Sequence, residues 1–269
     1  MKDNILPDLA GIYNNYIQIE GRKNVANRYD GKEHYYHASQ AGMCARKNYY
    51  SSTNEPPTNL PEAKAERVMR LGTIIHEDLQ NAFSLFQEKE SSKEKELCNS
   101  VLYKDLYKDL YNNYKGIKTI SMEEEIIIDK LNVRGFYDLV IQMVTEEVFL
   151  VDFKSIGSYG YKLKYGRNPR IDDHEYQELQ LATYGIAIKE KYGRLDGMYL
   201  FHYNKDSSMV KQKIVPINYL AKAERYWKQL NGRMNMGMPP IQDGISPVMS
   251  WECNYCRWKD TCFNSNRRD

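Results

Sequence analysis

EEEIIIDKLNVRGFYDLVIQMVTEEVFLVDFKSI, residues 123–156, contains the clearest strand signals in the chain. β-branched and aromatic residues dominate it, and turn-forming residues separate its apolar runs, which is typical of neighbouring strands. The pattern predicts three strands, at about residues 122–129, 132–144 and 147–153. The apolar residues on either side of Asp152 indicate that the third of these strands is buried.

Helical spacing of apolar residues flanks these strands. Before them it predicts helices at about residues 9–19, 62–87 and 93–114. After them the pattern predicts two more helices, at about residues 173–191 and 217–236. It also predicts two more strands, at about residues 197–203 and 209–216. The chain is therefore expected to be of the α/β class, with a mixed β-sheet core flanked by helices.

Composition limits the class of protein. The chain has 269 residues, of which 28% are charged and 42% hydrophobic, as expected of a soluble globular protein. A net charge of +2 means that any basic surface must come from local clustering. Residues 1–20 lack the pattern of a secretory signal, and no apolar run approaches the roughly 20 residues that cross a bilayer. Since five cysteines without a signal favour reduced thiols, we expect a cytoplasmic protein with no membrane segment.

Three charged residues lie on the predicted second and third strands. Asp138 lies in GFYD, and Asp152 and Lys154 lie in VDFK. Residues two apart on a strand point to the same face, so Asp152 and Lys154 project together, and a hairpin would bring Asp138 beside them. Such residues are usually on the surface, but a charge on a buried strand must be paired or bind a metal. Two carboxylates and a lysine can hold a divalent cation and activate water for attack on a phosphate.

Polar residues on two predicted helices add to this pattern. His76 lies in the apolar stretch LGTIIHEDL, where it is either a hydrogen-bonded core residue or a ligand that suits a manganese-type ion. Gln180 and Tyr184 are four residues apart and share a helix face. They either pack inward together or contact a phosphate and orient the lysine.

CNYCRWKDTC, residues 253–262, places Cys253, Cys256 and Cys262 within ten positions. Zinc and iron–sulfur clusters usually take four cysteine ligands, so this segment lacks one. The spacing does not distinguish a zinc site from a [4Fe–4S] cluster.

In their order, these motifs resemble the PD-(D/E)xK nucleases of the RecB-like branch, and especially the CRISPR-associated iron–sulfur exonucleases. The motifs are GxxxH at 72–76, GxxD at 135–138, DxK at 152–154 and QxxxY at 180–184. The resemblance extends from about residue 37 to 263. It implies a restriction-endonuclease-like fold in a single domain, 1–269, whose N- and C-terminal parts are joined by an iron–sulfur cluster. The nuclease core is expected at about 62–216, the cluster-binding parts at 37–61 and 217–269, and a helical insertion at 84–118.

The resemblance also implies roles for single residues. His76, Asp138, Asp152 and the backbone carbonyl of Phe153 resemble ligands of Mn²⁺ or Mg²⁺. Lys154 would position or activate water and stabilise developing charge. Gln180 and Tyr184 would support the site and its DNA. The expected catalytic residues are therefore Asp138, Asp152, Lys154, Gln180 and Tyr184.

For the cysteines, the resemblance supplies the missing ligand. The family joins a distant N-terminal cysteine to a C-terminal C-x2-C-x5-C, so Cys44, in HASQAGMCARKNYY, is expected to join Cys253, Cys256 and Cys262. It also favours a structural [4Fe–4S] cluster over zinc. Cys98, within a predicted helix, is interpreted as a packed free thiol.

A basic and aromatic segment, KSIGSYGYKLKYGRNPR, follows the predicted catalytic strand at residues 154–170. Basic groups bind phosphates and aromatic rings stack on unpaired bases, so the segment is expected to bind single-stranded DNA. The alternative is a solvated loop made flexible by glycines. The candidate DNA-binding residues are Tyr159, Tyr161, Lys162, Lys164, Tyr165, Arg167 and Arg170.

Three functions remain open from the sequence. The family's activity suggests an exonuclease that degrades mainly single-stranded DNA from an end. The alternatives are a catalytically idle DNA-binding subunit and a restriction-like endonuclease of the same fold. Protein partners would belong to CRISPR adaptation, recombination or viral DNA metabolism.

Overall fold

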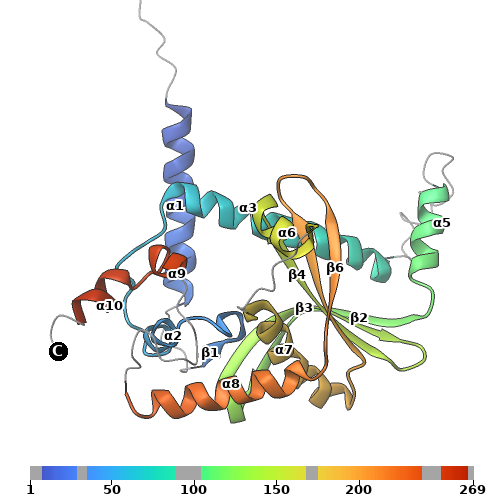
Figure 1. The fold of residues 1–269 in the computed structure, drawn as a ribbon. Coiled ribbons are helices and arrows are strands. Elements are labelled where there is room, and N and C mark those ends of the chain that lie inside the picture. Colours follow the sequence, from blue (N-terminus) through green and yellow to red (C-terminus); the bar gives the residue numbers. More distant parts are fainter. Residues whose placement is uncertain (1–7, 29–34, 89–103, 168–174, 238–249, 266–269) are drawn as a thin grey trace, which may run out of the picture. The chain divides into compact units, whose positions relative to one another are not determined.

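The structure is a computed structural model that describes residues 8–28, 35–88, 104–167, 175–237 and 250–265 (Figure 1). The chain forms two compact units. The first comprises residues 1–36, 43–73 and 230–269, and the second comprises residues 37–42 and 74–229.

The described residues form a six-stranded mixed sheet with the order β1-β3-β4-β5-β6, in which β2 also pairs with β3. β2–β3, β3–β4 and β5–β6 are antiparallel, whereas β4–β5 is parallel. The strands are β1 (Tyr36–His37), β2 (Ile117–Ile128), β3 (Val133–Met143), β4 (Val148–Ile156), β5 (Gly197–Asn204) and β6 (Val210–Val215).

The parallel pair β4–β5 determines where the neighbouring helices lie. Parallel strands need a crossover connection, and here it contains α6 (Ser158–Tyr165) and α7 (Tyr176–Tyr192). α7 packs across β2 to β5. The crossover therefore places α7 beside the residues that end β4.

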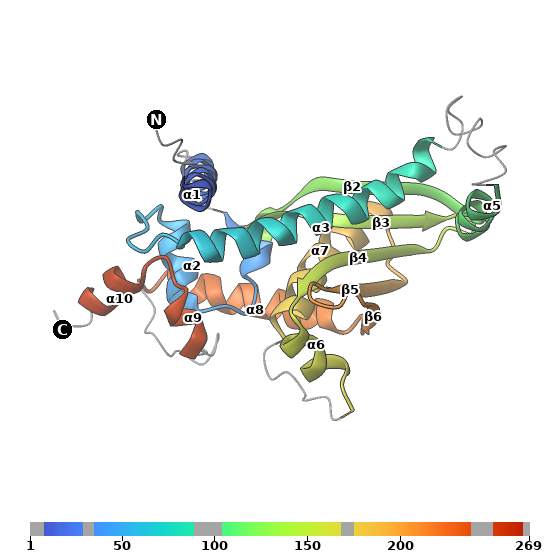
Figure 2. The same ribbon diagram turned by 90° about the horizontal axis from the view of Figure 1, so that it is seen from above.

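An apolar core joins the opposite side of the sheet to the C-terminal part of α3 (Ala63–Glu88) and to α5 (Lys104–Asn113). Figure 1 shows this part of α3 above the sheet and α7 below it, and Figure 2 shows α3 crossing over β2 and β3. Because side chains alternate along a strand, a strand that buries one residue here directs the next to the other face. The core residues are Phe86, Tyr114, Ile120, Leu139 and Phe153.

Helix α8 (Tyr219–Met234) packs on α7 through a buried tryptophan. Trp227 is fully buried, and its indole N–H donates to the Thr183 hydroxyl at 2.8 Å. A buried polar group therefore has its partner. The short 3-10 turns of this unit are η1 (Ala38–Gln40) and η2 (Asp129–Leu131).

The first unit joins segments from both ends of the chain. Its helices include α1 (Leu9–Arg28), α2 (Ala45–Ser52), α9 (Ser250–Asn254) and α10 (Lys259–Ser265). Trp258 stacks on Tyr50 with ring centroids 6.2 Å apart, and its indole N–H donates to the Glu55 carbonyl at 2.8 Å. Residues near the C-terminus thus complete a core begun near residue 50.

The predicted α/β class, with a mixed sheet flanked by helices, is confirmed. β3 and β5 lie within a residue of their predicted bounds, whereas β2 begins at Ile117 rather than near 122. The segment after β4 is not a flexible loop over its first part, because residues 158–165 form α6. Cys98, Arg170 and the first part of the helix predicted at 93–114 lie outside the described residues. No helix in the described ranges is long and apolar enough to span a membrane.

Candidate active site

β3 and β4 separate at the level of Asp138 and Asp152. The ladder between the two strands ends at the pair Leu139–Val151, and β4 continues against β5. At this fork the backbone N–H of Phe153 donates to Oδ2 of Asp138 at 2.5 Å rather than to the neighbouring strand. The fork therefore holds Asp138 against the strand that carries Asp152.

Asp152 and Lys154 form a close ion pair on one face of β4. The Asp152 side chain is 1% exposed and that of Lys154 is 17% exposed. Lys154 Nζ lies 2.7 Å from Oδ2 of Asp152. Because this buried oxygen accepts no hydrogen bond of normal geometry, the ammonium charge is what compensates its loss of water.

His76 reaches the same fork from α3. Its Nδ1 lies 3.8 Å from Oδ2 of Asp138, and its ring meets that of Phe153 edge to face, with centroids 6.1 Å apart. Burial, followed by the Lys154 charge, lowers the pKa of His76, although the Asp152 charge opposes this. At neutral pH the imidazole is therefore neutral and has a lone pair to offer a cation.

Gln180 and Tyr184 of α7 support Asp152 from the other side. Gln180 Nε2 donates to the Tyr184 hydroxyl at 3.1 Å and lies 3.5 Å from Oδ1 of Asp152. The Tyr184 ring lies against Gly135 of β3, where a Cβ atom would be only 2.9 Å from Cε1 of the ring. The glycine of GxxD and the tyrosine of QxxxY are thus in direct contact.

The two carboxylates repel each other in the fork. Burial raises the pKa of Asp138 well above its ordinary value, and the Asp152 charge raises it further, against the opposing effect of Lys154. A divalent cation would remove this repulsion. Two carboxylates and a neutral imidazole are donor types that fit Mg²⁺ or Mn²⁺.

The structure brings the sequence-predicted site residues of this unit together but does not arrange them as a closed ligand set. Within the described ranges, no group of three or more His, Cys, Asp or Glu side chains is placed to hold a metal ion. His76 Nδ1, 3.8 Å from Oδ2 of Asp138, is a further donor atom at the edge of this group. The residues brought together at the fork are His76, Asp138, Asp152, Phe153, Lys154, Gln180 and Tyr184.

Helix α6 carries most of the basic and aromatic segment, and its tyrosines differ in exposure. Tyr159 is 74% exposed, whereas Tyr161 is 6% exposed and is not available to stack on a base. Tyr165 donates to or accepts from His202 Nδ1 at 2.7 Å, and Lys211 lies over its ring. Of the three tyrosines, Tyr159 therefore presents its ring most fully to solvent.

His202 is a buried residue that sequence reasoning missed. It pairs with Lys154 in the β4–β5 register and is 0% exposed. Its Nε2 lies 3.1 Å from the Gln177 amide oxygen, and burial lowers its pKa to about 3. This neutral imidazole joins α6 and α7 beside the lysine strand, and its place within FHY gave no sign of this.

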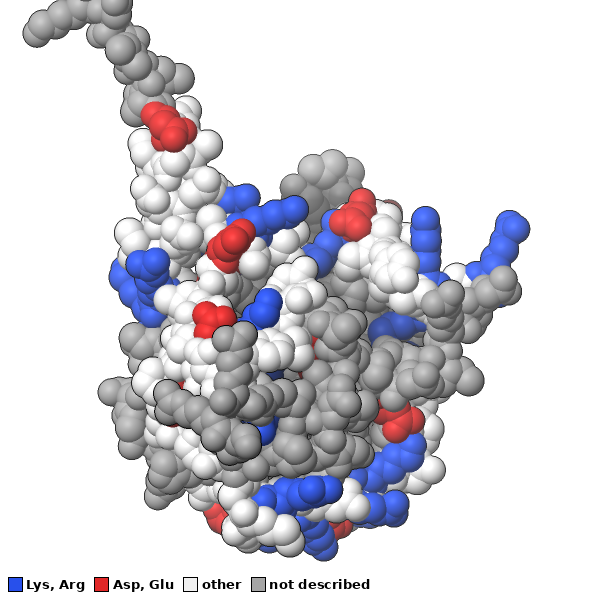
Figure 3. Space-filling view, turned by 60° about the vertical axis from the view of Figure 1, so that its left-hand side comes forward, with Lys and Arg blue, Asp and Glu red and all other residues white. Residues whose placement is uncertain are grey.

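Charged side chains are dispersed over the face of the molecule in Figure 3. Lysine and arginine groups lie there among aspartate, glutamate and uncharged residues.

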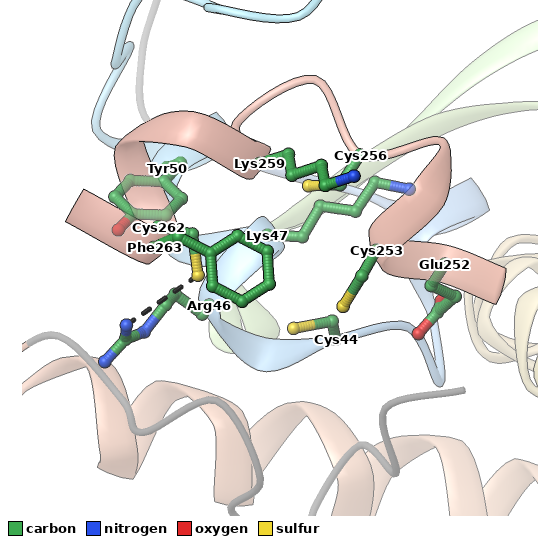
Figure 4. A pocket seen from close by; sticks show the side chains of 10 residues that line it. All are labelled: Cys44, Arg46, Lys47, Tyr50, Glu252, Cys253, Cys256, Lys259, Cys262 and Phe263. Carbon is green, nitrogen blue, oxygen red and sulfur yellow. Dashed lines mark hydrogen bonds between the residues drawn. The ribbon is translucent and has the colours of Figure 1, made fainter. Parts of the chain in front are cut away.

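The four cysteines of the predicted cluster line one pocket in the first unit. Cys44 precedes α2, Cys253 lies in α9, Cys256 follows it, and Cys262 lies in α10. In Figure 4 the side chains of Cys44 and Cys253 point toward each other, and Cys262 lies beside Arg46. The other lining residues are Lys47, Tyr50, Glu252, Lys259 and Phe263.

Three thiols of this pocket, those of Cys44, Cys253 and Cys256, are neutral at pH 7 without a metal. Burial raises the pKa of Cys44 to about 11, and it also raises the pKa values of Cys253 and Cys256. Metal binding requires thiolates, and a four-thiolate site carries negative charge that Arg46 and the two lysines of the pocket can balance. The donor set therefore fits an iron–sulfur cluster or zinc.

One acidic residue beside the fork was not singled out from the sequence. Glu123 of β2 accepts a short hydrogen bond from Gln80, which lies one turn after His76 on α3. The charges of Glu123 and Asp152 act on each other. The only available signal was the run of three glutamates at 123–125, which reads as an exposed strand end.

Comparison with known proteins finds a family and solved structures to which the chain is similar. A family model described as the PD-(D/E)XK nuclease superfamily matches residues 103–263. Among solved structures, the chain is similar to SSO0001, with 16% identity, a TM-score of 0.42, and 94% of this chain and 95% of that chain covered. It is also similar to a "Putative exonuclease" from Eubacterium rectale, with 12% identity, a TM-score of 0.45, and 85% and 89% covered. A search of the curated proteins finds no match.

Proposed function

Because this chain belongs to the PD-(D/E)XK nuclease superfamily, we propose that it is a metal-dependent DNA exonuclease acting mainly on single-stranded ends. The observation that carries the proposal is the fork itself. Lys154 lies 2.7 Å from a buried Asp152, and Asp138 is tied to the same strand through the Phe153 N–H. An acid pair can hold a divalent cation and a lysine can stabilise the charge that develops in phosphodiester hydrolysis.

In this proposal His76, Asp138, Asp152 and the Phe153 carbonyl hold Mn²⁺ or Mg²⁺. When bound, the cation supplies a Lewis acid and lowers the pKa of a water molecule. Lys154 donates hydrogen bonds from its ammonium group toward the attacked phosphate and stabilises the negative charge that develops there.

The residues of α7 keep this arrangement in place. Gln180 holds Asp152 in orientation through its amide, and Tyr184 fixes Gln180 in turn. Tyr184 stays protonated, because burial and the Asp152 charge raise its pKa. It therefore acts as a neutral hydrogen-bonding group and not as a second base.

Helix α6 supports single-strand binding. Tyr159 is exposed, and Lys162 and Arg167 are exposed near it along the chain, with Lys164 half-buried. An aromatic ring among phosphate-binding groups suits an unpaired strand, because stacking requires bases that are not already stacked in a duplex. Action from an end rests on the resemblance of the four motifs to exonucleases.

We further propose that Cys44, Cys253, Cys256 and Cys262 hold a structural [4Fe–4S] cluster. The common pocket and its basic lining support a four-thiolate group, and the resemblance to CRISPR-associated exonucleases favours iron–sulfur over zinc. Such a protein would work in a reducing cytoplasm. Its partners would belong to CRISPR adaptation, recombination or viral DNA metabolism.

Digestion of an end-labelled single strand beside a closed single-stranded circle tests the activity. We expect the wild type with Mn²⁺ to digest only the linear strand. Lys154→Ala should lower the rate by about 10²–10³-fold and leave Mn²⁺ binding, measured by calorimetry, largely intact. Lys130→Ala is the matched control, because Lys130 is exposed. Among the described residues its one ion pair is with Glu190, at 3.4 Å.

Each other outcome assigns a different function. Cleavage of the circle would identify an endonuclease. DNA binding without cleavage by the wild type would identify an idle binding subunit. Cleavage by Lys154→Ala at the wild-type rate would show that the lysine is not catalytic.

A further inference from the structure

Glu123 lies directly across from Asp138 at the fork. In the β2–β3 ladder, Met122 pairs with Leu139 and Glu124 pairs with Tyr137, which leaves Glu123 opposite Asp138. The third carboxylate therefore belongs to the same part of the sheet as the acid pair.

The backbone at Glu123 adopts a left-handed conformation that is unusual within a strand. Its φ is 53°, in the left-handed region that residues other than glycine, asparagine and aspartate rarely occupy. Such a conformation costs about 1–3 kcal/mol and persists where the surroundings enforce it, often at functional sites. A glycine here would avoid that cost, so the glutamate side chain is the part that needs explaining.

The Glu123 side chain is held by a helix that also carries a proposed ligand. Gln80 donates its amide N–H to Oε1 of Glu123. Since Gln80 and His76 are four residues apart, they lie on the same face of α3. The same helix face thus reaches both Asp138 and the carboxylate opposite it.

The charges around the fork are unequal without a cation. Three carboxylates, those of Asp138, Asp152 and Glu123, act on one another there, and Lys154 is the basic group paired with them. One lysine thus faces three carboxyl groups, and a divalent cation would offset this excess of acidic groups. The neighbouring Glu124 is already paired with Lys191 at 2.6 Å.

We infer that Glu123 is a positioning residue of the proposed catalytic centre, whose carboxylate strengthens divalent-cation binding at Asp138 and Asp152 from outside the ligand set. The inference rests on the proposed metal-dependent function. Glu123 acts through its charge and its fixed orientation, because it is exposed and held by Gln80 rather than enclosed with the acid pair.

Mn²⁺ titration calorimetry on Glu123→Gln tests the inference. The amide oxygen of the new side chain can still accept the hydrogen bond from Gln80, so only the charge is lost. We expect Mn²⁺ affinity to fall by about 10- to 100-fold, the range for groups that support metal ligands. Glu125→Gln is the matched control, because it removes the same charge from an exposed position on the same strand, and it should bind Mn²⁺ within about twofold of the wild type.

Glu123→Gly separates a functional role from a structural one. Removing the side chain relieves the left-handed conformation, so the cation-free protein should unfold at the same or a higher temperature while Mn²⁺ affinity falls. A residue retained only for stability would instead lower the unfolding temperature when replaced. That result, or wild-type Mn²⁺ affinity in Glu123→Gln, would overturn the inference.

The failure of the inference and that of the proposed function look different in this experiment. If the wild type binds Mn²⁺, Asp152→Asn does not, and Glu123→Gln binds normally, the catalytic proposal stands and the role of Glu123 is refuted. If the wild type itself binds no Mn²⁺, both are refuted.

Discussion

Replacing Gly135 by alanine should damage the site without touching any charged group. A Cβ atom at Gly135 would lie 2.9 Å from Cε1 of Tyr184 and 3.0 Å from Cβ of Ala38. Ordinary carbon–carbon contacts are about 3.5–4.0 Å, so the ring must move by about 0.6–1 Å. Tyr184 is 4% exposed, so such a movement displaces other packed atoms.

The size of the effect follows from this overpacking. One inserted methyl group that cannot be accommodated costs about 1–3 kcal/mol, out of the 5–15 kcal/mol that stabilise a typical domain. The Tyr184 hydroxyl would move away from Gln180, 3.1 Å distant, and Gln180 is already 3.5 Å from Asp152. We therefore expect cleavage to fall along with stability.

Urea unfolding of Gly135→Ala gives the cost directly. Gly160→Ala is the control, because a Cβ atom at Gly160 has no neighbour within 4 Å and the residue lies in helix α6. It should stabilise the protein by about 0.5–1 kcal/mol. In a Tyr184→Ala background, Gly135→Ala should cost much less than it does in the wild type, because the two positions are coupled. An unchanged unfolding free energy for Gly135→Ala, or a cost that persists without the ring, would refute the steric argument.

Three further expectations concern charge, DNA and the cysteines. Asp138→Asn should stabilise the cation-free protein at neutral pH, because the raised pKa of Asp138 makes its ionised carboxylate costly in the folded state. The gain in stability should shrink as the pH falls toward the ordinary pKa of aspartate. Thermal unfolding in the presence of a chelator, measured at several pH values, checks this. Replacing the basic residues of the α6 segment by alanine should flatten the salt dependence of single-strand binding by about 0.7 in slope per lost phosphate contact, as measured by fluorescence anisotropy with variants at Lys162, Lys164 and Arg167. Cys44→Ser should abolish visible absorption and bound iron and cost up to about 5 kcal/mol of stability, whereas Cys98→Ser should change neither; stoichiometric zinc in a colourless wild type would replace the cluster by a zinc site.

The strands and the acid pair could be predicted because their signals are local. Runs of β-branched and aromatic residues define β3 and β4, and the period of two along a strand places Asp152 and Lys154 on one face. The hairpin between the strands then brings Asp138 to the same level. Each of these steps depends on neighbours in the sequence, so no knowledge of the rest of the fold was needed.

Other features depend on tertiary contacts that leave no local signal. Glycines in the α6 segment suggest flexibility, yet Tyr161 is buried and Tyr165 is bound to His202, which anchors residues 158–165 as a helix. Glu123 looks like one of three equivalent glutamates until the register places it opposite Asp138. In both cases the decisive partner is distant in the sequence.

The joining of both chain ends in the first unit has a consequence for biosynthesis. Trp258 and Glu55 are 203 positions apart, and Arg46 and Cys262 are 216 apart. At translation rates of about 5–20 residues per second, the early segment waits roughly 10–40 s for its partner. During that interval Cys44 and Tyr50 have no completed core, whereas nearly all of the second unit has already emerged. We expect nascent chains that end before residue 250 to fold the sheet first and to leave Cys44 open to alkylation until the last helices are released.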